Sequence, residues 1–553
     1  MSSTTTQHMG RYNYIYEATS YWDSENQRTD NYKTSIGMVD TTTGETFYKQ
    51  QYIDKLNREG KPTEGMKVWI DGRRVTAKRG NVLPMEAEEL AKEILDTVKD
   101  YGVAYFLQAI AEKTGLLGIL GKAIPQCWRK IFVLACYLIA SDKSIMYCSD
   151  WTEENECLDA GNMTSQRISE LLTGFGHKER SDFYSQWYSY ISENEYIALD
   201  ITSVSSYSEN IDFMEWGYNR DGDDLPQANI CMLFGEKSML PIYQTLYSGS
   251  LGDVSTLEST LTEFSALTGN MDIMLIMDKA FYSIKNVNMM LGGKEHHYNF
   301  VLPVSFTSNF AKNLVINEQN SIDSIKNVIL TSGSPIRGVH KILKWGNTGA
   351  KIHTYVFFNP EKAVKERNKL YGHVTWLIKK ATIDPKNKKL QKEFKRYLII
   401  NNPVEAAGGN SIEVRDDVIE KELETTGWFV IISNKIDDTQ TAYDMYRAKD
   451  AVEKSFFQYK NNFGINRFHV HNDERVLNKT FIAFIALILS SHIHNIMKEK
   501  QLDRLMTFDK LLIILRKLKV AYVKGIIVLR PLTKDQKHIF KSFGIEFPGS
   551  SVG

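Results

Sequence analysis

Short, continuous apolar runs mark the middle of the chain and predict strands buried on both faces of a sheet. Three such runs, each followed by polar residues, are Tyr196–Leu199, Ile273–Met277 and Tyr298–Val304. Two further strands are predicted at Asn229–Phe234 and Met239–Tyr247.

Helical periodicity separates the later strands. Asp253–Leu267 and Ser283–Met290 place apolar residues on one face at a period of about 3.6. The predicted order is therefore three successive strands, then helix, strand, helix, strand. This order is typical of an RNase H-like core, an α/β fold in which helices cover a mixed sheet.

Residues 306–435 interrupt that core and are predicted to form a separate β-rich insertion. Its predicted strands are Val339–Lys344, Lys351–Phe358, Val374–Ala381, Tyr397–Ile400 and Trp428–Ser433. Residues 361–396 hold twelve Lys or Arg against four Asp or Glu, a net charge of +8. Such a stretch is either a solvated lysine-rich loop or, beside a site that handles DNA, a surface for phosphates.

Upstream of the core, the pattern predicts hairpins and then helices. The hairpins are Ile36–Tyr48, with Gly44 in its turn, and Val68–Val75, with a turn at Asp71-Gly72. The predicted helices are Met85–Tyr101, Trp128–Ala140, Thr164–Thr173 and Glu179–Ser192. The last two are an ordinary helical hairpin or a helix-turn-helix in which Gln166 and Arg167 reach DNA.

Composition narrows the class of protein. The 553 residues imply two to four domains, and 67 Lys and Arg balance 67 Asp and Glu, so a binder of nucleic acid would have to rely on local charge. The five cysteines lack CxxC spacing and predict free thiols in a reducing compartment. The N-terminus has no signal pattern, and the longest apolar run, Phe481–Leu489, falls far short of the roughly 20 residues that span a bilayer. We expect a soluble intracellular protein.

Two aspartates share one context. Asp200 follows the run YIAL and Asp278 follows IMLIM, so each stands where an apolar strand gives way to polar residues. A single aspartate at such a place is often only a turn or cap residue. Two of them on strands of one sheet are candidates for a joint site, because sites gather at strand ends.

A predicted helix, Ala442–Asn461, carries a stripe of reactive side chains. Tyr446, Lys449, Glu453 and Lys460 fall within an arc of about 60° at roughly 100° per residue. Val452, Phe456 and Tyr459 lie beside the stripe and are expected to seat the helix on a core. For an isolated helix the alternative is a solvated charged face.

Glu453 would complete a set of three carboxylates with the two aspartates. Carboxylates held together repel one another unless a cation neutralises them. Hard oxygen ligands favour Mg²⁺ or Mn²⁺, and two such ions can activate a nucleophile and stabilise the leaving oxygen of a phosphodiester. Asp450 projects close enough to the stripe to compete with Glu453 as the metal ligand.

These residues resemble the DDE transposases of bacterial insertion sequences, in the branch that bears the YREK signature (transposase family 11-like). The signature, Tyr-x₂-Arg-x₃-Glu-x₆-Lys, is present in register as Tyr446, Lys449, Glu453 and Lys460, with lysine at the usual arginine position and Arg447 nearby. The string KDAVEKSFFQYKNNFGINR also resembles the family's catalytic helix. The resemblance covers roughly residues 160–500.

The resemblance implies a cut-and-paste transposase with a metal-dependent triad. Asp200, Asp278 and Glu453 would be the catalytic residues and the ligands of two Mg²⁺ or Mn²⁺ ions. Tyr446, Arg447, Lys449 and Lys460 would contact DNA. The partners would be double-stranded DNA, as terminal inverted repeats and target, and a second copy of the chain in a homodimer, without a membrane. The place of action would be the bacterial cytoplasm, at the nucleoid.

The same resemblance implies the domain organisation. The expected parts are 1–84 (hairpins or arm), 85–194 (helical, DNA ends), 195–305 (first part of the core), 306–435 (insertion), 436–500 (catalytic helix and rest of the core) and 501–553 (C-terminal region).

Several alternatives stay open. Trp345 or Trp376 of the insertion would hold a flipped base or be a core tryptophan. His469 and His471 would approach DNA or be structural. A glycosidase would explain the acids but not the lysines, and a catalytically inactive, DNA-binding descendant of a transposase is the remaining alternative.

Overall fold

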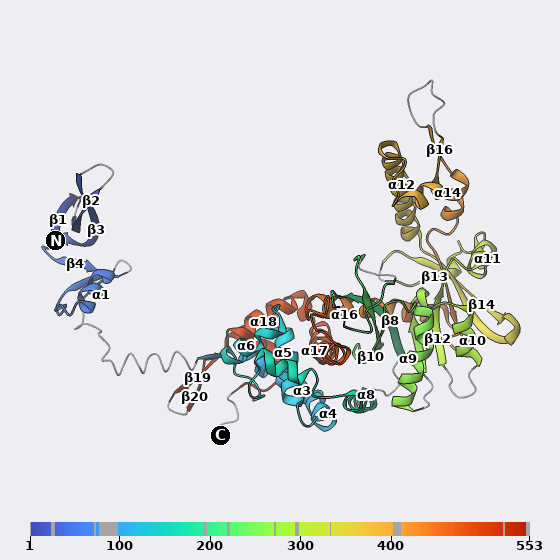
Figure 1. Cartoon of the computed structure of the whole chain (residues 1–553), viewed down its shortest axis with the longest axis horizontal. Helices are drawn as coiled ribbons and strands as arrows, with labels where there is room; N and C mark the ends of the chain where they lie inside the picture. The colour runs from blue at the N-terminus through green and yellow to red at the C-terminus, as the bar shows by residue number, and fades with distance from the viewer. Residues whose placement is uncertain are drawn as a thin grey trace. The chain divides into compact units, whose positions relative to one another are not determined.

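The computed structural model shows a mixed α/β protein whose chain forms two compact units (Figure 1). One unit comprises Met1–Val98 with Ala521–Ile527, and the other comprises Lys99–Val520 with Val528–Gly553. The structure describes residues 2–10, 12–23, 28–70, 73–76, 98–191, 196–208, 210–217, 222–269, 273–292, 298–331, 333–401, 411–523 and 526–548.

The N-terminal unit is a six-stranded sheet in sequence order with one helix. Its elements are β1 (Ser2–Met9), β2 (Tyr12–Asp23), β3 (Arg28–Asp40), β4 (Thr46–Lys49), α1 (Gln50–Arg58), β5 (Lys67–Ile70) and β6 (Arg73–Thr76). Both predicted hairpins are confirmed: β3 pairs with β4 around Gly44, whose φ of 71° suits glycine, and β5 pairs with β6. The predicted turn Asp71-Gly72 lies outside the described residues.

Helices open the second unit. They are α3 (Gly102–Lys113), α4 (Leu116–Ala123), α5 (Trp128–Ala140), α6 (Cys148–Glu154), α7 (Ser165–Leu171) and α8 (His177–Ile191). The helix predicted at Trp128–Ala140 is confirmed as α5, which is buried over Ile131–Ala140 as its apolar composition requires. The pair predicted around the glycine turn is confirmed as α7 and α8. The helix predicted at Met85–Tyr101 lies almost wholly outside the described residues.

A nine-stranded sheet follows. Its strands are β8 (Tyr196–Ser205), β9 (Gln227–Gly235), β10 (Pro241–Ser248), β11 (Ile273–Met277), β12 (Tyr298–Val304), β13 (Val328–Ile329), β14 (Ile336–Trp345), β15 (Ala350–Phe358) and β18 (Trp428–Ser433). Their spatial order is β10-β9-β8-β11-β12-β18-β15-β14-β13. The strands β8, β11 and β12 run parallel, and all other pairs are antiparallel.

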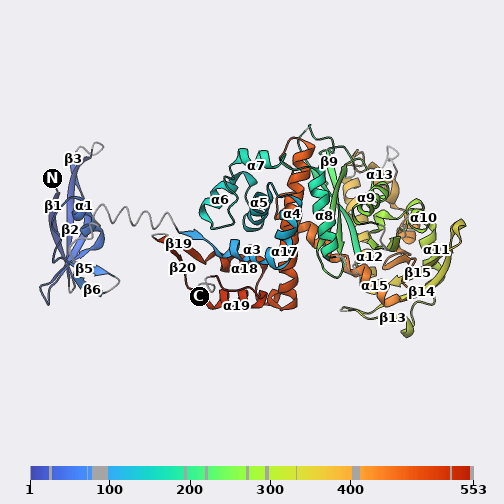
Figure 2. The same cartoon turned by 90° about the horizontal axis from the view of Figure 1, so that it is seen from below.

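Helices cover this sheet, which explains its continuous apolar runs. Every residue of β9 and β11 is buried. The covering helices include α9 (Asp253–Thr268), α10 (Ile284–Gly292) and α11 (Asn309–Glu318), and α8 and α9 both pack on β10 (Figure 2). The five predicted strands and two predicted helices of the core are thereby confirmed.

The insertion differs from its prediction in two ways. The strands β14, β15 and β18 do not form a separate module, because β18 pairs with β12 and extends the main sheet. The strand predicted at Val374–Ala381 is wrong, since these residues lie in the long helix α12 (Pro360–Ile383). Asn359 caps this helix and Pro360 starts it, and the buried positions Val374, Leu377 and Ala381 repeat at helical spacing.

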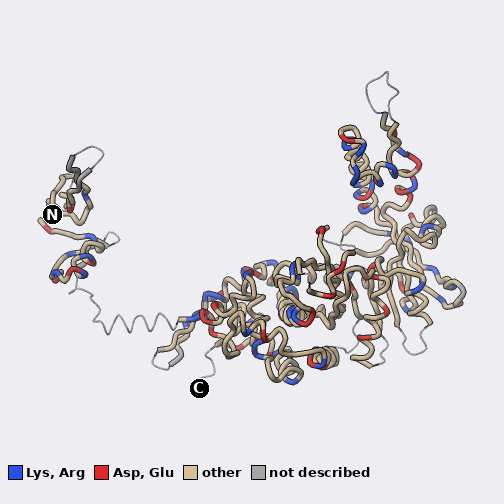
Figure 3. Tube along the Cα trace, in the orientation of Figure 1, with Lys and Arg blue, Asp and Glu red and all other residues tan. Residues whose placement is uncertain are grey.

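The helix α12 packs in a small cluster of its own. The cluster joins α12 to α13 (Gln391–Tyr397), β16 (Leu398–Asn401), β17 (Ser411–Val414) and α14 (Asp416–Leu423). Its buried residues include Leu377, Phe394 and Ile419. The predicted basic stretch therefore lies mostly on the helices α12 and α13, with Lys386, Lys388 and Lys389 in the short connection between them (Figure 3).

The C-terminal part returns to the sheet and to the helices. It comprises α15 (Thr439–Ala448), α16 (Asp450–Asn461), α17 (Asp473–Glu499), α18 (Phe508–Arg516), β19 (Lys519–Val523), β20 (Ile526–Leu529) and α19 (Lys534–Phe543). In β19, Lys519 and Val520 pair with β7 (Lys99–Asp100). Among the described single helices, only α17 is long and apolar enough to cross a membrane, and 89% of its apolar window is buried inside the protein. This burial agrees with the buried helix predicted for Phe481–Leu489.

Candidate active site

Two neighbouring parallel strands bring Asp200 and Asp278 to one level of the sheet. Leu199 of β8 is paired with Met277, the last residue of β11, and the next residue of each segment is an aspartate. Asp278 follows β11 and caps a short 3₁₀ turn, where its carboxylate accepts a hydrogen bond from the Lys279 amide at 2.6 Å. The prediction that the sheet joins these two residues is confirmed.

Asp200 does not end its strand, which corrects the prediction. The strand β8 continues to Ser205, because β9 pairs with it along that whole length and Asp200 itself faces Met232. Polar Thr202 and Ser203 are therefore strand residues and not the start of a loop. Alternation along the strand places Asp200 and Thr202 on the same face of the sheet.

The ammonium group of Lys449 lies against both aspartates. Its Nζ is 3.1 Å from Asp278 Oδ2 and 3.9 Å from Asp200 Oδ1. The lysine side chain is only 6% exposed, against 16% for Asp200 and 34% for Asp278. The cation thus offsets the repulsion of two carboxylates that the sheet holds side by side. The sequence predicts only a DNA contact for Lys449, because the spacing along the helix carries no signal for its contact with the two aspartates.

Lys460 lies on the same face, further along β8. Its ammonium donates a hydrogen bond to the Ser203 carbonyl at 2.7 Å and approaches the Thr202 hydroxyl at 3.4 Å. Because Thr202 shares a face with Asp200, the signature lysine stands one pleat from the first aspartate.

The single helix predicted for Ala442–Asn461 is divided at Lys449. The helix α15 ends at Ala448 and α16 begins at Asp450, although Lys449 keeps φ −57° and ψ −28°. One helical projection therefore does not describe the whole stripe. Tyr446, on α15, is partly buried with its ring 6.0 Å from that of Phe429, whereas Arg447 is exposed.

The expected packing of α16 on the core is confirmed for Phe456 and Tyr459. Phe456 is 6% exposed and Tyr459 is fully buried. The Tyr459 hydroxyl donates to Gln244 Oε1 and to the Thr480 carbonyl, both at 2.9 Å. These bonds tie α16 to β10 and to α17. The side chain of Val452 lies outside the described residues.

The third predicted carboxylate cannot be placed by its side chain. Glu453 lies in α16, and so does its rival Asp450, but the side chains of both are outside the described ones. Among the described residues, no group of three or more His, Cys, Asp or Glu is arranged to hold a metal ion.

The described donors nevertheless fit a divalent cation. The carboxylates of Asp200 and Asp278 converge on one positive group, the Lys449 ammonium, so a cation position exists between them. Carboxylate oxygens are the ligands that Mg²⁺ and Mn²⁺ prefer.

Residues predicted further away differ in their placement. Trp345 is 7% exposed and donates to Asn288 Oδ1 at 2.8 Å, which confirms the core interpretation. Trp376 on α12 is 42% exposed, stacked on His373. On α7, Gln166 and Arg167 are exposed and both contact Glu170. None of these side chains belongs to the pair of aspartates.

A protein family and a solved structure are similar to this chain. Residues 192–489 match the family described as the transposase DDE domain. No curated protein matches the chain significantly. Among solved structures, the chain is similar to that of the piggyBac transposase synaptic complex with hairpin DNA, at 11% identity and a TM-score of 0.35, over 77% of each chain. The family match spans more than half of the 553 residues and contains both aspartates, Glu453 and the signature lysines, so the chain belongs to the transposase DDE domain family.

Proposed function

We propose that this protein is an active DNA transposase that moves an insertion sequence by cut-and-paste transposition. The observation that carries the proposal is the convergence of Asp200, Asp278 and Lys449 from two strands and a helix junction within the matched domain. The reactions would be hydrolysis of a phosphodiester at each end of the element, followed by strand transfer to target DNA.

We also propose that the strands β8 to β12 form an RNase H-like core. Support comes from the spatial order β10-β9-β8-β11-β12, in which the first three strands are antiparallel and β11 and β12 run parallel to β8. This arrangement has the two aspartates on its central neighbouring strands.

The catalytic residues of the proposal are Asp200, Asp278 and Glu453, which would hold two Mg²⁺ or Mn²⁺ ions. The bound metal would activate water or a 3′-hydroxyl and stabilise the leaving oxygen. Lys460 of α16, which donates a hydrogen bond to the Ser203 carbonyl of β8, would orient a DNA phosphate beside Asp200. Tyr446 and Arg447 would contact DNA near the end of the element, and Lys449 would contact DNA once the aspartates no longer need its charge.

Charge on the insertion supports DNA as the substrate. Nine lysines between 365 and 395 are exposed on and around α12 and α13: Lys365, Lys369, Lys379, Lys380, Lys386, Lys388, Lys389, Lys392 and Lys395. Only part of the stretch is offset locally, as where Arg396 contacts Glu422 on α14. Exposed lysines of this density suit the phosphates of double-stranded DNA.

The finer assignment rests on the signature on α15 and α16. Tyr446, Lys449, Glu453 and Lys460 support the YREK branch of bacterial insertion-sequence transposases. We infer from it that the chain works as a homodimer on two terminal inverted repeats, in the bacterial cytoplasm.

One observation favours a second candidate function, a DNA-binding descendant without catalysis. The ammonium of Lys449 occupies the approach to both aspartates, where arginine is usual at this position of the signature. A lysine that never leaves this position would exclude the metal.

Cleavage of DNA by the purified full-length chain tests the proposal. The substrate is a duplex carrying the inverted repeats that flank the gene, incubated with Mg²⁺. The wild type is expected to nick at the repeat ends, and Asp278→Asn is expected to slow nicking about a thousandfold, because metal ligation supplies several kcal/mol in the transition state. Asp182→Asn on α8, a half-exposed residue that pairs only with Lys178 of the same helix among the described residues, is the matched control. Tight binding of the ends without nicking by the wild type would establish the inactive descendant instead.

A further inference from the structure

A cavity with polar and apolar lining lies beside the end of β8, beyond the two aspartates. Its volume is about 340 Å³, and its lining includes Ser206, Ser208, Asn210, Arg467, His469 and His471. Ser205 and Arg467 form a bridge between the strand end and the segment that connects α16 to α17. The cavity therefore touches both the strand of Asp200 and the segment that follows the signature helix.

The lining of the cavity suits an anion. None of the described residues that line it is acidic, and its hydroxyl, amide and imidazole groups can donate hydrogen bonds. Arg467 is held in place by Asp223, with its NH2 2.7 Å from Asp223 Oδ2. Its side chain is 26% exposed, so the guanidinium is positioned rather than loose.

A buried lysine contacts the backbone of the segment that lines the cavity. Lys479 on α17 is 6% exposed, and its ammonium donates a hydrogen bond to the carbonyl of Phe468 at 2.8 Å. Phe468 lies between Arg467 and His469 in the sequence. None of the described carboxylates pairs with it. Burial lowers the pKa of Lys479 to about 8, so the ammonium is the predominant form at neutral pH.

The field of these cations reaches the cavity. Burial first, and then the charges of Lys479 and Arg467, hold the pKa of His469 below its usual value. His469 also adopts a left-handed backbone with φ of 49°, which is uncommon for a residue other than glycine. Arg467 is offset by Asp223, but Lys479 leaves one positive charge that an incoming anion would offset.

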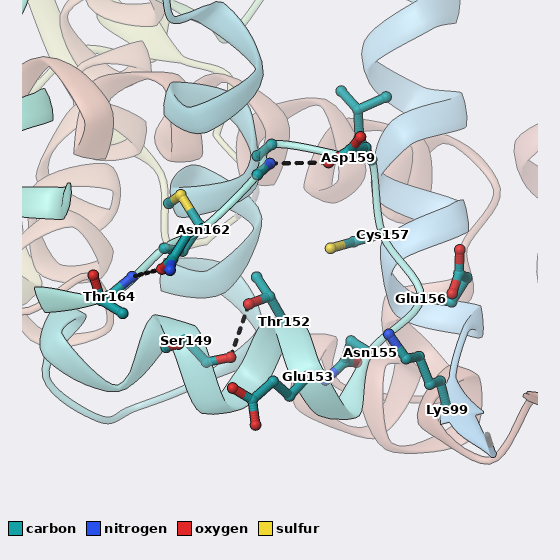
Figure 4. Close-up of a pocket in the computed structure, with 14 residues that line it drawn as sticks. Lys99, Ser149, Thr152, Glu153, Asn155, Glu156, Cys157, Asp159, Asn162 and Thr164 are labelled. Carbon is teal, nitrogen blue, oxygen red and sulfur yellow. Dashed lines mark hydrogen bonds between the residues drawn. The ribbon is translucent and has the colours of Figure 1, made fainter. Parts of the chain in front are cut away.

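A second cavity has the opposite character. It lies among the helices, with a volume of about 540 Å³, and its lining residues include Glu153, Glu156 and Asp159 but only one lysine, Lys99 (Figure 4). The side chains of Asp159 and Asn162 accept hydrogen bonds from the loop's own amides. Acidic lining makes this cavity unsuitable for a phosphate, so the two cavities are distinguished by charge.

We propose that the cavity of Arg467, His469 and His471 binds a backbone phosphate of the DNA strand that enters the active site. Arg467 and the two histidines would contact the phosphate, the hydroxyls of Ser206 and Ser208 would complete the hydrogen bonds, and Lys479 would act through its charge. The inference rests on the proposed function, since it takes DNA as the ligand. It adds a site outside the aspartates and the signature stripe.

Binding measured without cleavage tests the site. The probe is a short fluorescein-labelled DNA duplex of arbitrary sequence, titrated by anisotropy in EDTA at several salt concentrations. Lys479→Met is expected to weaken binding about tenfold, because the positive charge beside the phosphate is lost, and to make the affinity less dependent on salt. Lys498→Met, the same substitution at an exposed position of α17, is expected to bind like the wild type. Equal affinity of the two variants would overturn the proposal.

Chemical protection provides a second readout that does not depend on a folded variant. His469 and His471 of the wild type are carbethoxylated with diethyl pyrocarbonate, with and without the duplex, and the products are mapped by mass spectrometry. Protection of both histidines by DNA, and competition by inorganic phosphate, are expected. Unchanged labelling would refute the site. Neither experiment requires strand cleavage, so failure of the catalytic proposal would be seen separately, in the nicking assay.

Discussion

Lys449 connects the two halves of the proposed catalytic centre. Its ammonium lies within 4 Å of carboxylates from β8 and β11, at the point where α15 gives way to α16. Lys449 is the counter-ion of the two aspartates and, in the proposed function, a contact for DNA. Stability measurements separate the first role from the second, because they need no DNA.

Replacement of this lysine should destabilise the metal-free protein. Lys449→Met leaves two carboxylates without their cation, at a cost of roughly 2 kcal/mol, less than for a fully buried pair because Asp278 is partly exposed. Addition of Mg²⁺ should then raise the melting temperature of the variant more than that of the wild type. Thermal unfolding with and without Mg²⁺ measures both effects, and Lys449→Arg is the control that keeps the charge. An unchanged melting temperature in EDTA would contradict the counter-ion role.

The identity of the third carboxylate is a separate question at the same centre. Glu453→Gln should abolish nicking of end DNA, whereas Asp450→Asn should retain it, because the spacing from Glu453 to Lys460 fits the signature. The loss is expected to be about a thousandfold, as for the other ligands. The opposite result, with Asp450 essential and Glu453 dispensable, would move the third ligand to Asp450.

The helix α16 presents its lysine because the adjacent face of the helix is anchored in the core. Tyr459 is fully buried and bonds to Gln244 on β10 and to Thr480 on α17, while Phe456 packs beside it. The helix thus rests on the sheet and on α17 together, and Lys460 reaches Ser203 from that seat. Position along the helix, not charge alone, decides what the lysine contacts.

Loss of the anchoring hydroxyl should therefore be measurable. Tyr459→Phe leaves buried Gln244 with an unpaired oxygen and should lower the free energy of unfolding by about 1–2 kcal/mol. Urea denaturation gives this value. Tyr371→Phe on α12 is the matched control, since Tyr371 is 50% exposed and its hydroxyl is accessible to water. Similar losses for both variants would show that the buried bonds do not stabilise the seat.

The long helix α17 holds the second unit together. It packs on α3 and α5 among the helices, and on β10 and α16 beside the sheet. Buried polar groups accompany this role: Asn478 donates to the Leu172 and Phe175 carbonyls of the turn between α7 and α8. His492, on the same helix, has an Nε2 atom that is buried and without a partner among the described residues.

His492 should make the stability of this unit depend on pH. Burial lowers its pKa to about 4, below the ordinary value near 6.5, so the unfolded chain binds the proton more readily. The stabilisation is complete above about pH 6.5 and is lost as the pH falls toward 4, by roughly 2–3 kcal/mol. His492→Leu should flatten that part of the curve of unfolding free energy against pH. The same replacement at exposed His538 is the control, and equal curves for wild type and His492→Leu would contradict the prediction.

Most helices and strands could be predicted from short stretches of sequence, because apolar runs and residue spacing are local signals. Apolar runs identified β11, β12 and β18 to the residue, and the spacing of the signature identified the helix that carries Lys460. The family followed from the same residues. Val374–Ala381 contains aromatic and β-branched residues typical of strands, but the cap at Asn359 and the helical spacing of the buried positions make it part of α12.

Pairing between distant segments could not be predicted in this way. The length of β8 depends on its partner β9, so Asp200 lies inside a strand although the apolar run before it ends. The strands β14, β15 and β18 of the insertion belong to the main sheet because β18 pairs with β12, whereas β16 and β17 pair only with each other.

The composition and spacing of the chain therefore predicted most of its elements, its family and its two aspartates. Only the tertiary structure places Lys449 against both aspartates and Lys460 against the backbone of β8. It also places Lys479 against the carbonyl of Phe468, next to Arg467. The physical reason is that a charge acts over a few ångströms of space, whereas the groups that share this site are separated by up to about 260 residues of chain.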